Sequence, residues 1–221
     1  MSLLISGVAA YGFGQTIGEN LIHPAVSRPW VLYVHASIFF GWVAVFVVQT
    51  ALVQTRQVRW HRRFGWAGAV IGASIPLLGV VTSLSMARFN ILHSLDSPDG
   101  AAAFLIVPLN DMVDFSVCVA LGISWRRRPE YHRRLLLIGT CCLTAAAFAG
   151  FPFITVQALR WYAGVDVLIL LGLARDLIVN RNIHVVYRYA VPAVVFGQVV
   201  AMILFLQHVP AWMAIGRRLI G

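Results

Sequence analysis

The fold is decided by residues 30–66, which read WVLYVHASIFFGWVAVFVVQTALVQTRQVRWHRRFGW. The first 24 of these residues contain no Asp, Glu, Lys or Arg. As a helix that rises about 1.5 Å per residue, they reach roughly 36 Å, enough to cross a hydrocarbon core of about 30 Å. Residues 55–63 then hold four Arg and one His, which are too polar to remain in lipid, before a second uncharged run begins at Phe64. This pattern predicts a transmembrane hairpin with a basic turn.

The composition agrees with a membrane protein. Of the 221 residues, 60% are hydrophobic and 11% are charged, whereas soluble domains are about a quarter charged. The net charge of +9 comes from Arg residues in short loops between apolar runs, which indicates membrane orientation and not nucleic-acid binding. Walker, GxGxxG, GxSxG and HExxH motifs are absent from the sequence, so nucleotide-binding, hydrolase and zinc-protease functions have no support.

Six apolar stretches predict an all-α polytopic bundle of six transmembrane spans arranged as three hairpins. Residues 1–29 are expected to form a short or interfacial N-terminal helix and a connector, residues 30–212 the transmembrane domain, and residues 213–221 a basic C-terminal tail. The six stretches are residues 30–53, 64–87, 101–125, 135–159, 163–179 and 189–207.

The connectors between these stretches alternate in charge. Twelve Arg fall in the three turns on one side, at positions 56, 59, 62, 63, 126, 127, 128, 133, 134, 175, 181 and 188, and five fall on the other side. The positive-inside rule therefore predicts an inner-membrane protein with its Arg-rich turns in the cytoplasm. The Arg217 and Arg218 pair lies on the side that the rule assigns to the exterior.

The third stretch carries polar side chains near the middle of the bilayer. Asp111 and Asn110 precede Asp114 by three and four residues, so all three can share one helical face. A charged Asp at that depth costs on the order of 2.5 to 3.5 kcal/mol, so this face is expected to meet protein, water or a partner. Two interpretations stay open: a functional site, or hydrogen-bonded packing against Ser74, Thr144 or Gln198 on neighbouring spans.

Histidines supply a second set of candidate site residues. His35 lies inside an apolar run, roughly 7 Å below the predicted outer surface, and His23, His93 and His208 are expected on the same side. Converging imidazoles would hold a metal ion through His35 and His93, or haem b through His35 and His208. The alternative is a hydrogen-bonded His35 and solvated loop histidines.

The motif His-Arg-Arg occurs twice, at residues 61–63 and 132–134, each time before a span that runs outward. It indicates a hairpin repeat of about 70 residues, with His184 in a degenerate third copy. Basic and aromatic residues at such positions also reach lipid phosphates without any chemistry, and we take that as the simpler interpretation.

Several of these stretches resemble known families. HASIFFGWVAVFVVQTALV, WHRRFGWAGA, PLNDMVDF and PEYHRRLLLIGT are similar to a group of bacterial multi-spanning membrane proteins whose function is not established. His35 followed by Trp42 is similar to the first helix of the membrane protoporphyrinogen oxidase and copper-resistance membrane families. That second resemblance implies haem or metal near His35.

Three function classes follow from the sequence. The first is an accessory or assembly subunit of a larger membrane complex or homo-oligomer. The second is a haem- or metal-binding redox protein with an outer-side site near His35. The third is a small proton-coupled transporter that uses Asp111 and Asp114. The sequence names no reaction and no catalytic residue.

Overall fold

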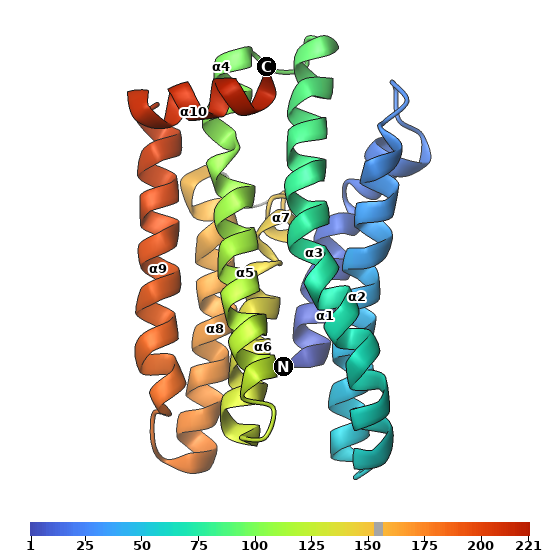
Figure 1. The fold of residues 1–221 in the computed structure, drawn as a ribbon, viewed down its shortest axis with the longest axis vertical. Helices are drawn as coiled ribbons and strands as arrows, with labels where there is room; N and C mark the ends of the chain where they lie inside the picture. The colour runs from blue at the N-terminus through green and yellow to red at the C-terminus, as the bar shows by residue number, and fades with distance from the viewer. Residues whose placement is uncertain (153–156) are drawn as a thin grey trace.

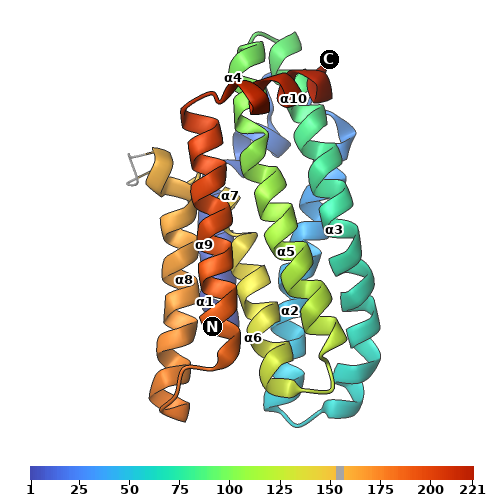
Figure 2. The same ribbon diagram turned by 60° about the vertical axis from the view of Figure 1, so that its left-hand side comes forward.

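The structure, a computed structural model, describes residues 1–152 and 157–221, and the side chains of these residues except 157–160 (Figures 1 and 2). The described residues form helices and no strand, as the sequence predicts. In chain order the helices are α1 (Ser2–Gly14), a π-helical turn η1 (Gly18–Ile22), α2 (Trp30–Gln54), α3 (Val58–Leu92), α4 (Pro98–Phe104), α5 (Ile106–Ser124), α6 (Pro129–Cys142), α7 (Ala145–Phe148), α8 (Gln157–Asn180), α9 (Val185–Leu206) and α10 (Pro210–Ile220).

The predicted first hairpin is formed by α2 and α3. Arg56, in the turn, has a φ of 59° and lets the chain reverse between the two helices. Small residues on α3 bring the helices close together: a Cβ atom at Gly72 would lie 2.8 Å from the indole ring of Trp42. Helix α3 begins at Val58, so Arg59, Arg62 and Arg63 of the predicted basic turn belong to the helix.

Helices α5 and α6 form the centre of the bundle. Phe115 on α5 is fully buried and packs edge-on against Trp42, with 5.2 Å between ring centroids. The indole nitrogen of Trp42 donates to Thr140 Oγ1 on α6 at 3.3 Å. These contacts connect the α2–α3 hairpin to α6 across the core.

The predicted fourth stretch, residues 135–159, is not one helix. Helix α6 ends at Cys142, α7 covers only four residues, and a turn follows at Gly150. Helix α1 packs against this interruption, where Gly12 touches the backbone of Ala147 and a side chain would not fit. One face of the short α1 therefore packs against the bundle, with Ile5 fully buried, while Leu3 and Tyr11 on its other side are exposed.

Four helical segments of the described chain are long and apolar enough to cross a membrane: Trp30–Gln54, Val58–Leu92, Pro98–Ser124 and Val185–Leu206. The six-span count is therefore not confirmed. The fourth predicted stretch is broken and lies partly outside the described residues, and the fifth falls in α8, which carries Asp166, Arg175 and Asp176.

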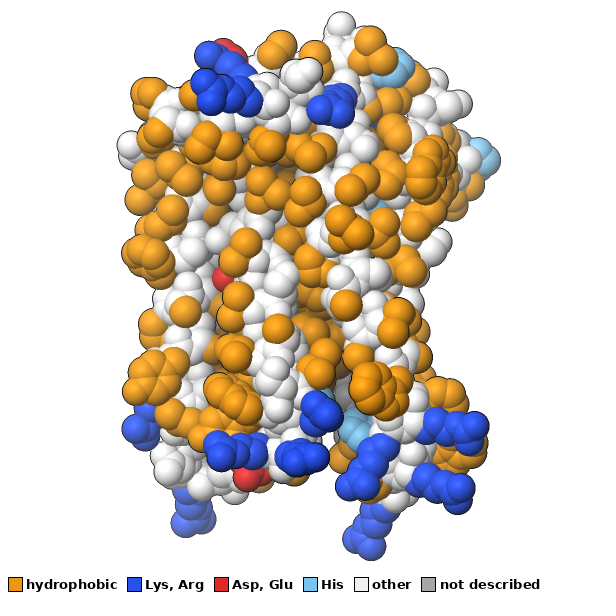
Figure 3. Space-filling model, viewed as in Figure 1, with side chains coloured by type: hydrophobic (Ala, Val, Ile, Leu, Met, Phe, Trp, Pro, Cys, Tyr) orange, Lys and Arg blue, Asp and Glu red, His pale blue; other side chains and the backbone are white. Residues whose placement is uncertain are grey.

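The two ends of the bundle differ. The α2–α3, α5–α6 and α8–α9 turns lie at the same end (Figure 1). At the other end, all of residues 213–221, predicted as a basic tail, except the last belong to α10, which lies across α4. The indole nitrogen of Trp212 donates to the carbonyls of Ala102 and Ala103, and Arg217 pairs with Asp99 at 2.8 Å. An apolar band separates the two charged ends (Figure 3).

Candidate functional site

The polar residues predicted at mid-depth come together between α5, α8 and α9. Asn110 Nδ2 donates to Asp114 Oδ2 at 3.0 Å. The Asn110 side chain lies over Gly197, where a Cβ atom would be 2.8 Å from Asn110 Oδ1. Asp111 on α5 and Gln198 on α9 are buried, at 9% and 4% exposure, whereas Asn110 and Asp114 are half-buried. The face therefore meets protein at Asp111, as the cost of a carboxyl in lipid requires.

Helix α8 adds two residues that the sequence analysis missed. The Tyr162 side chain lies beside Asn110 and Asp111, and Asp166 lies beside Gln198. Asp166 was detectable, because an acid inside the apolar run 163–179 carries the same cost as Asp111. The position of Tyr162 depends on the packing of α8 against α5, which no spacing in the sequence shows.

The other predicted partners of the carboxyls bond elsewhere. Ser74 Oγ donates to the carbonyl of Ile71, and Thr144 Oγ1 donates to the carbonyl of Cys141. This polar cluster therefore consists of the hydrogen-bonded side chains on α5 and their polar neighbours on α8 and α9.

The predicted outer-side histidines have separate surroundings. His35 stacks on Phe39 at 4.0 Å, and its Nδ1 is buried without a hydrogen-bond partner among the described residues. His93 Nδ1 lies 2.9 Å from the carbonyl of Phe89, and His208 is exposed in the α9–α10 turn. Among the described residues, no group of three or more His, Cys, Asp or Glu is placed to hold a metal ion. Metal or haem at His35, His93 and His208 stays a prediction.

A cavity of about 1250 Å³ opens at the Arg-rich end, between the α2–α3 hairpin and helices α5, α6, α8 and α9. Figure 3 shows this end hollowed between two groups of Arg side chains, with a histidine at the edge of the hollow. Six Arg and one Asp line the cavity, namely Arg62, Arg126, Arg127, Arg133, Arg134, Arg175 and Asp176. Its deeper walls are mostly apolar and include Trp42, Val45, Phe46, Ile123, Leu136 and Leu137.

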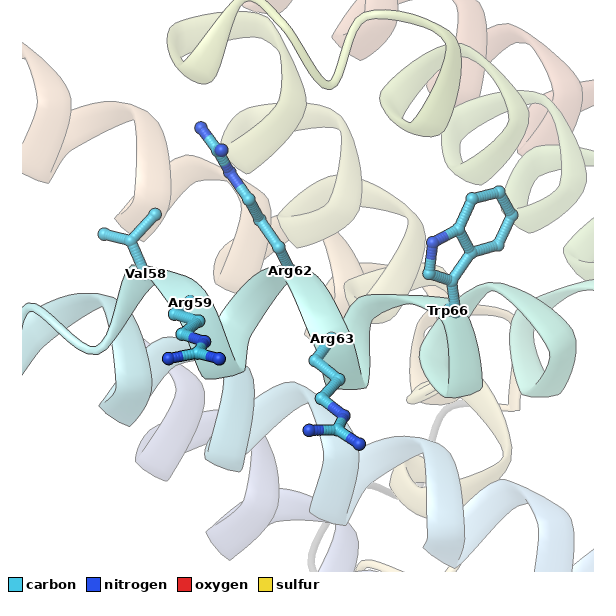
Figure 4. Close-up of a pocket in the computed structure, with 5 residues that line it drawn as sticks. All are labelled: Val58, Arg59, Arg62, Arg63 and Trp66. Atoms are coloured by element: carbon cyan, nitrogen blue, oxygen red, sulfur yellow. The ribbon is translucent and has the colours of Figure 1, made fainter.

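The first turns of α3 present their side chains on two sides. A shallow groove of about 640 Å³ is lined by Val58, Arg59, Arg62, Arg63 and Trp66. Figure 4 shows Arg62 and Trp66 projecting on the side of α3 opposite to Arg59 and Arg63. Arg62 and Trp66 also line the large cavity, so the other two arginines face away from it.

An ion pair is buried in the wall of the cavity. Arg134 on α6 bonds to both carboxylate oxygens of Asp176 on α8 through contacts of 2.6 to 2.8 Å, and both side chains are 5% exposed. Asn180 Nδ2 donates to the same carboxylate at 2.7 Å. The sequence analysis counted Arg134 as a loop charge and did not consider Asp176. The pair neutralises one of the six Arg that line the cavity. The net charge of the cavity lining therefore remains positive.

Histidines from the three repeated turns meet at this end. The ring centroids of His61 and His132 are 6.3 Å apart, and both residues line the cavity. His184 packs against Tyr131, with 4.8 Å between centroids, and caps α9 by accepting a hydrogen bond from the N–H of Val186. Burial, followed by the charge of the nearby Arg134, lowers the pKa of His184 from its ordinary 6.5. The simpler interpretation of the His-Arg-Arg motif, contact with lipid phosphates, did not anticipate these ring contacts within the protein.

Comparison with protein-family models, with curated proteins and with solved structures finds no match to this chain. The family resemblances seen in the sequence stay predictions. The functional argument therefore depends on the geometry of the chain's own residues, and it has two candidate sites: the polar cluster on α5, α8 and α9, and the cavity at the Arg-rich end.

Proposed function

We propose that this chain is a multi-span helical membrane protein that holds an anionic, largely apolar molecule in the cavity at its Arg-rich end. The observation that carries the proposal is the cavity itself, which combines apolar walls with six Arg and a single Asp. Arg guanidinium groups form charge-assisted, often bidentate hydrogen bonds to carboxylates and phosphates. A ligand with an anionic head and an apolar body matches both parts of the cavity.

Unpaired polar groups in the cavity wall support the same proposal. Both side-chain polar atoms of Gln49 are buried and have no hydrogen-bond partner among the described residues. Buried polar groups in proteins are normally satisfied, and leaving one unpaired costs about 1 to 3 kcal/mol. A bound molecule with polar atoms would supply the missing partners.

The proposal includes the predicted orientation, in which the Arg-rich turns face the cytoplasm and the protein resides in the bacterial inner membrane. It also agrees with an accessory or assembly subunit, because such a subunit would contribute its bound molecule to a larger complex. A cysteine placed in the α2–α3 turn should react with a membrane-impermeant thiol reagent only in inverted vesicles. A cysteine at position 218 should react only in right-side-out vesicles.

The binding proposal is tested on detergent-purified protein by native mass spectrometry. We expect a bound anionic molecule to remain with the wild type and to be lost from the variant Arg62→Gln/Arg127→Gln. The control Arg217→Gln/Arg218→Gln removes the same charge at the opposite end and should keep the molecule. The proposal fails if the wild type carries no such molecule, or if the two double variants retain it equally.

Proton-coupled transport through Asp111 and Asp114 is a second candidate function. The observation that favours it is the position of Tyr162 on α8 beside Asp111, together with a second polar contact between Asp166 of α8 and Gln198 of α9. A buried chain of carboxyl, hydroxyl and amide groups is a suitable path for protons. Proteoliposomes containing wild type should then dissipate an imposed pH gradient faster than those containing Asp111→Asn.

A further inference from the structure

We propose that the molecule held at the Arg-rich end is haem b, with His61 and His132 as the two axial ligands of its iron. This inference rests on the proposed function, because haem is an anionic and largely apolar molecule. It places the cofactor at the Arg-rich end of the bundle. The sequence alone predicted the cofactor at the opposite end, near His35. The argument depends on the separation of the two imidazoles, their free nitrogens and the residues around them.

The separation of the two rings matches a bis-histidine iron. A bond between a metal and an imidazole nitrogen is about 2.0 Å. Bond lengths of about 1.33 Å give the five-membered ring a radius of roughly 1.1 Å. Two such bonds and two ring radii in line predict about 6.2 Å between ring centroids. The observed separation is 6.3 Å.

The ring planes are also compatible with a shared iron. Each imidazole plane contains its own metal–nitrogen bond, and rotation about that bond leaves the coordination intact. The angle of 82° between the rings is therefore no obstacle to two axial ligands on one iron. The two ligands come from the first turns of α3 and α6, which fix them on separate helices.

The free nitrogens have the arrangement expected of ligands. His132 Nδ1 lies 2.8 Å from the carbonyl oxygen of Gly122 and donates its hydrogen there, which leaves the Nε2 lone pair available. Histidines that bind metals commonly donate their other N–H to a backbone carbonyl in this way. His61 Nδ1 is buried without a hydrogen-bond partner among the described residues, so this ring has a nitrogen free to take a ligand.

The His-Arg-Arg repeat supplies the rest of the site. Arg62 follows His61 and Arg133 follows His132, and both Arg line the same cavity. They are placed to pair with the two propionates of haem. The apolar walls that include Trp42, together with Ile123 and Leu136, suit the macrocycle.

Haem explains the pair better than a bare ion. No group of three or more ligating side chains is found in the described part of the chain, whereas a haem iron receives four nitrogens from the porphyrin and needs only two from the protein. Two His ligands fill the remaining iron positions. The site would therefore suit one-electron transfer and not the binding of O₂.

The decisive experiment is the visible spectrum of detergent-purified protein, before and after dithionite, from cells supplied with a haem precursor. Wild type should show a Soret band and, on reduction, the sharp α and β bands of low-spin haem. His61→Ala and His132→Ala should each lose the haem or convert it to a high-spin form. His35→Ala, which removes an imidazole at the other end, should keep the wild-type spectrum.

Titration of the haem-free protein with hemin provides a second measurement. Wild type should bind one equivalent, and His61→Ala should bind at least tenfold more weakly. Thiol-dye unfolding of each variant separates lost binding from lost folding. If wild type shows no Soret band and hemin gives no saturable change, the haem inference is overturned. In that case, retention of a different anionic molecule that depends on Arg62 and Arg127 would still support the proposed function. If the wild type binds neither haem nor any such anionic molecule, both proposals are wrong.

Discussion

The buried pair formed by Arg134 and Asp176 allows a quantitative test of the packing between α6 and α8. Asp176→Asn would leave the guanidinium group, 5% exposed, without its counter-charge. Breaking a buried ion pair on one side costs about 3 to 5 kcal/mol, because the remaining charge stays desolvated. For a chain of this size that corresponds to a fall of roughly 6 to 20 °C in the unfolding midpoint.

Thermal unfolding in detergent can be followed with a thiol-reactive dye. The three cysteines, Cys118, Cys141 and Cys142, are buried and free, so they react only when the bundle opens. Asp99→Asn is the matched control, since it breaks the pair with Arg217 in which both side chains are about 60% exposed. An exposed pair contributes about 0 to 1 kcal/mol, so the control should shift the midpoint by only a few degrees.

A double variant tests the cause of the loss. Arg134→Met/Asp176→Leu removes both charges and keeps apolar volume, and such replacements are often neutral or stabilising. We therefore expect it to recover most of the stability that Asp176→Asn loses. The reasoning is refuted if Asp176→Asn and Asp99→Asn shift the midpoint equally, or if the double variant is no more stable than Asp176→Asn.

Three further outcomes are expected in the same unfolding assay. Gly12→Ala should cost about 1 to 3 kcal/mol because its Cβ would meet the backbone of Ala147, whereas Gly7→Ala, where the added Cβ meets nothing within 4 Å, should not destabilise. His184 has a lowered pKa in the folded protein, so the unfolded chain binds more protons and stability should fall as the pH drops below about 6.5. His184→Asn retains a capping side chain and should flatten that fall; an unchanged pH profile would contradict the argument. Asp111→Asn should keep the free energy of unfolding within about 1 kcal/mol of wild type, because the amide preserves volume in a buried polar cluster, and a larger loss would mean that a carboxylate is required.

The sequence was sufficient for features that depend on local composition. The α2–α3 hairpin follows from an uncharged run of span length and a basic turn, and the structure confirms it. The grouping of Asn110, Asp111 and Asp114 on one helical face follows from their spacing, and Asn110 bonds to Asp114 in the structure. The common end of the three Arg-rich turns follows from the alternation of charge along the chain.

Features set by long-range packing were not predictable. Residues 135–159 are apolar and Ala-rich, so composition favours one long helix, but the chain turns where α1 packs against Ala147. The approach of His61 to His132 joins residues 71 positions apart, and their spacing in sequence carries no information about distance in space. The repeated His-Arg-Arg motif was the available signal. Because we interpreted this motif as residues that reach lipid phosphates, we did not predict the contact between His61 and His132.

The difference between the two ends of the bundle determines how a ligand would reach the cavity. At one end α10 lies across α4, and Arg88 donates to the carbonyls of Leu219 and Ile220 so that the helix is held at its last turn. At the other end, the cavity opens beside the α2–α3 and α5–α6 turns, with Met1 and Ser2 also in its lining. A bound molecule would therefore enter from the Arg-rich side. In the proposed orientation, with the Arg-rich turns in the cytoplasm, the proposed haem would reach His61 and His132 from that compartment without crossing the bilayer.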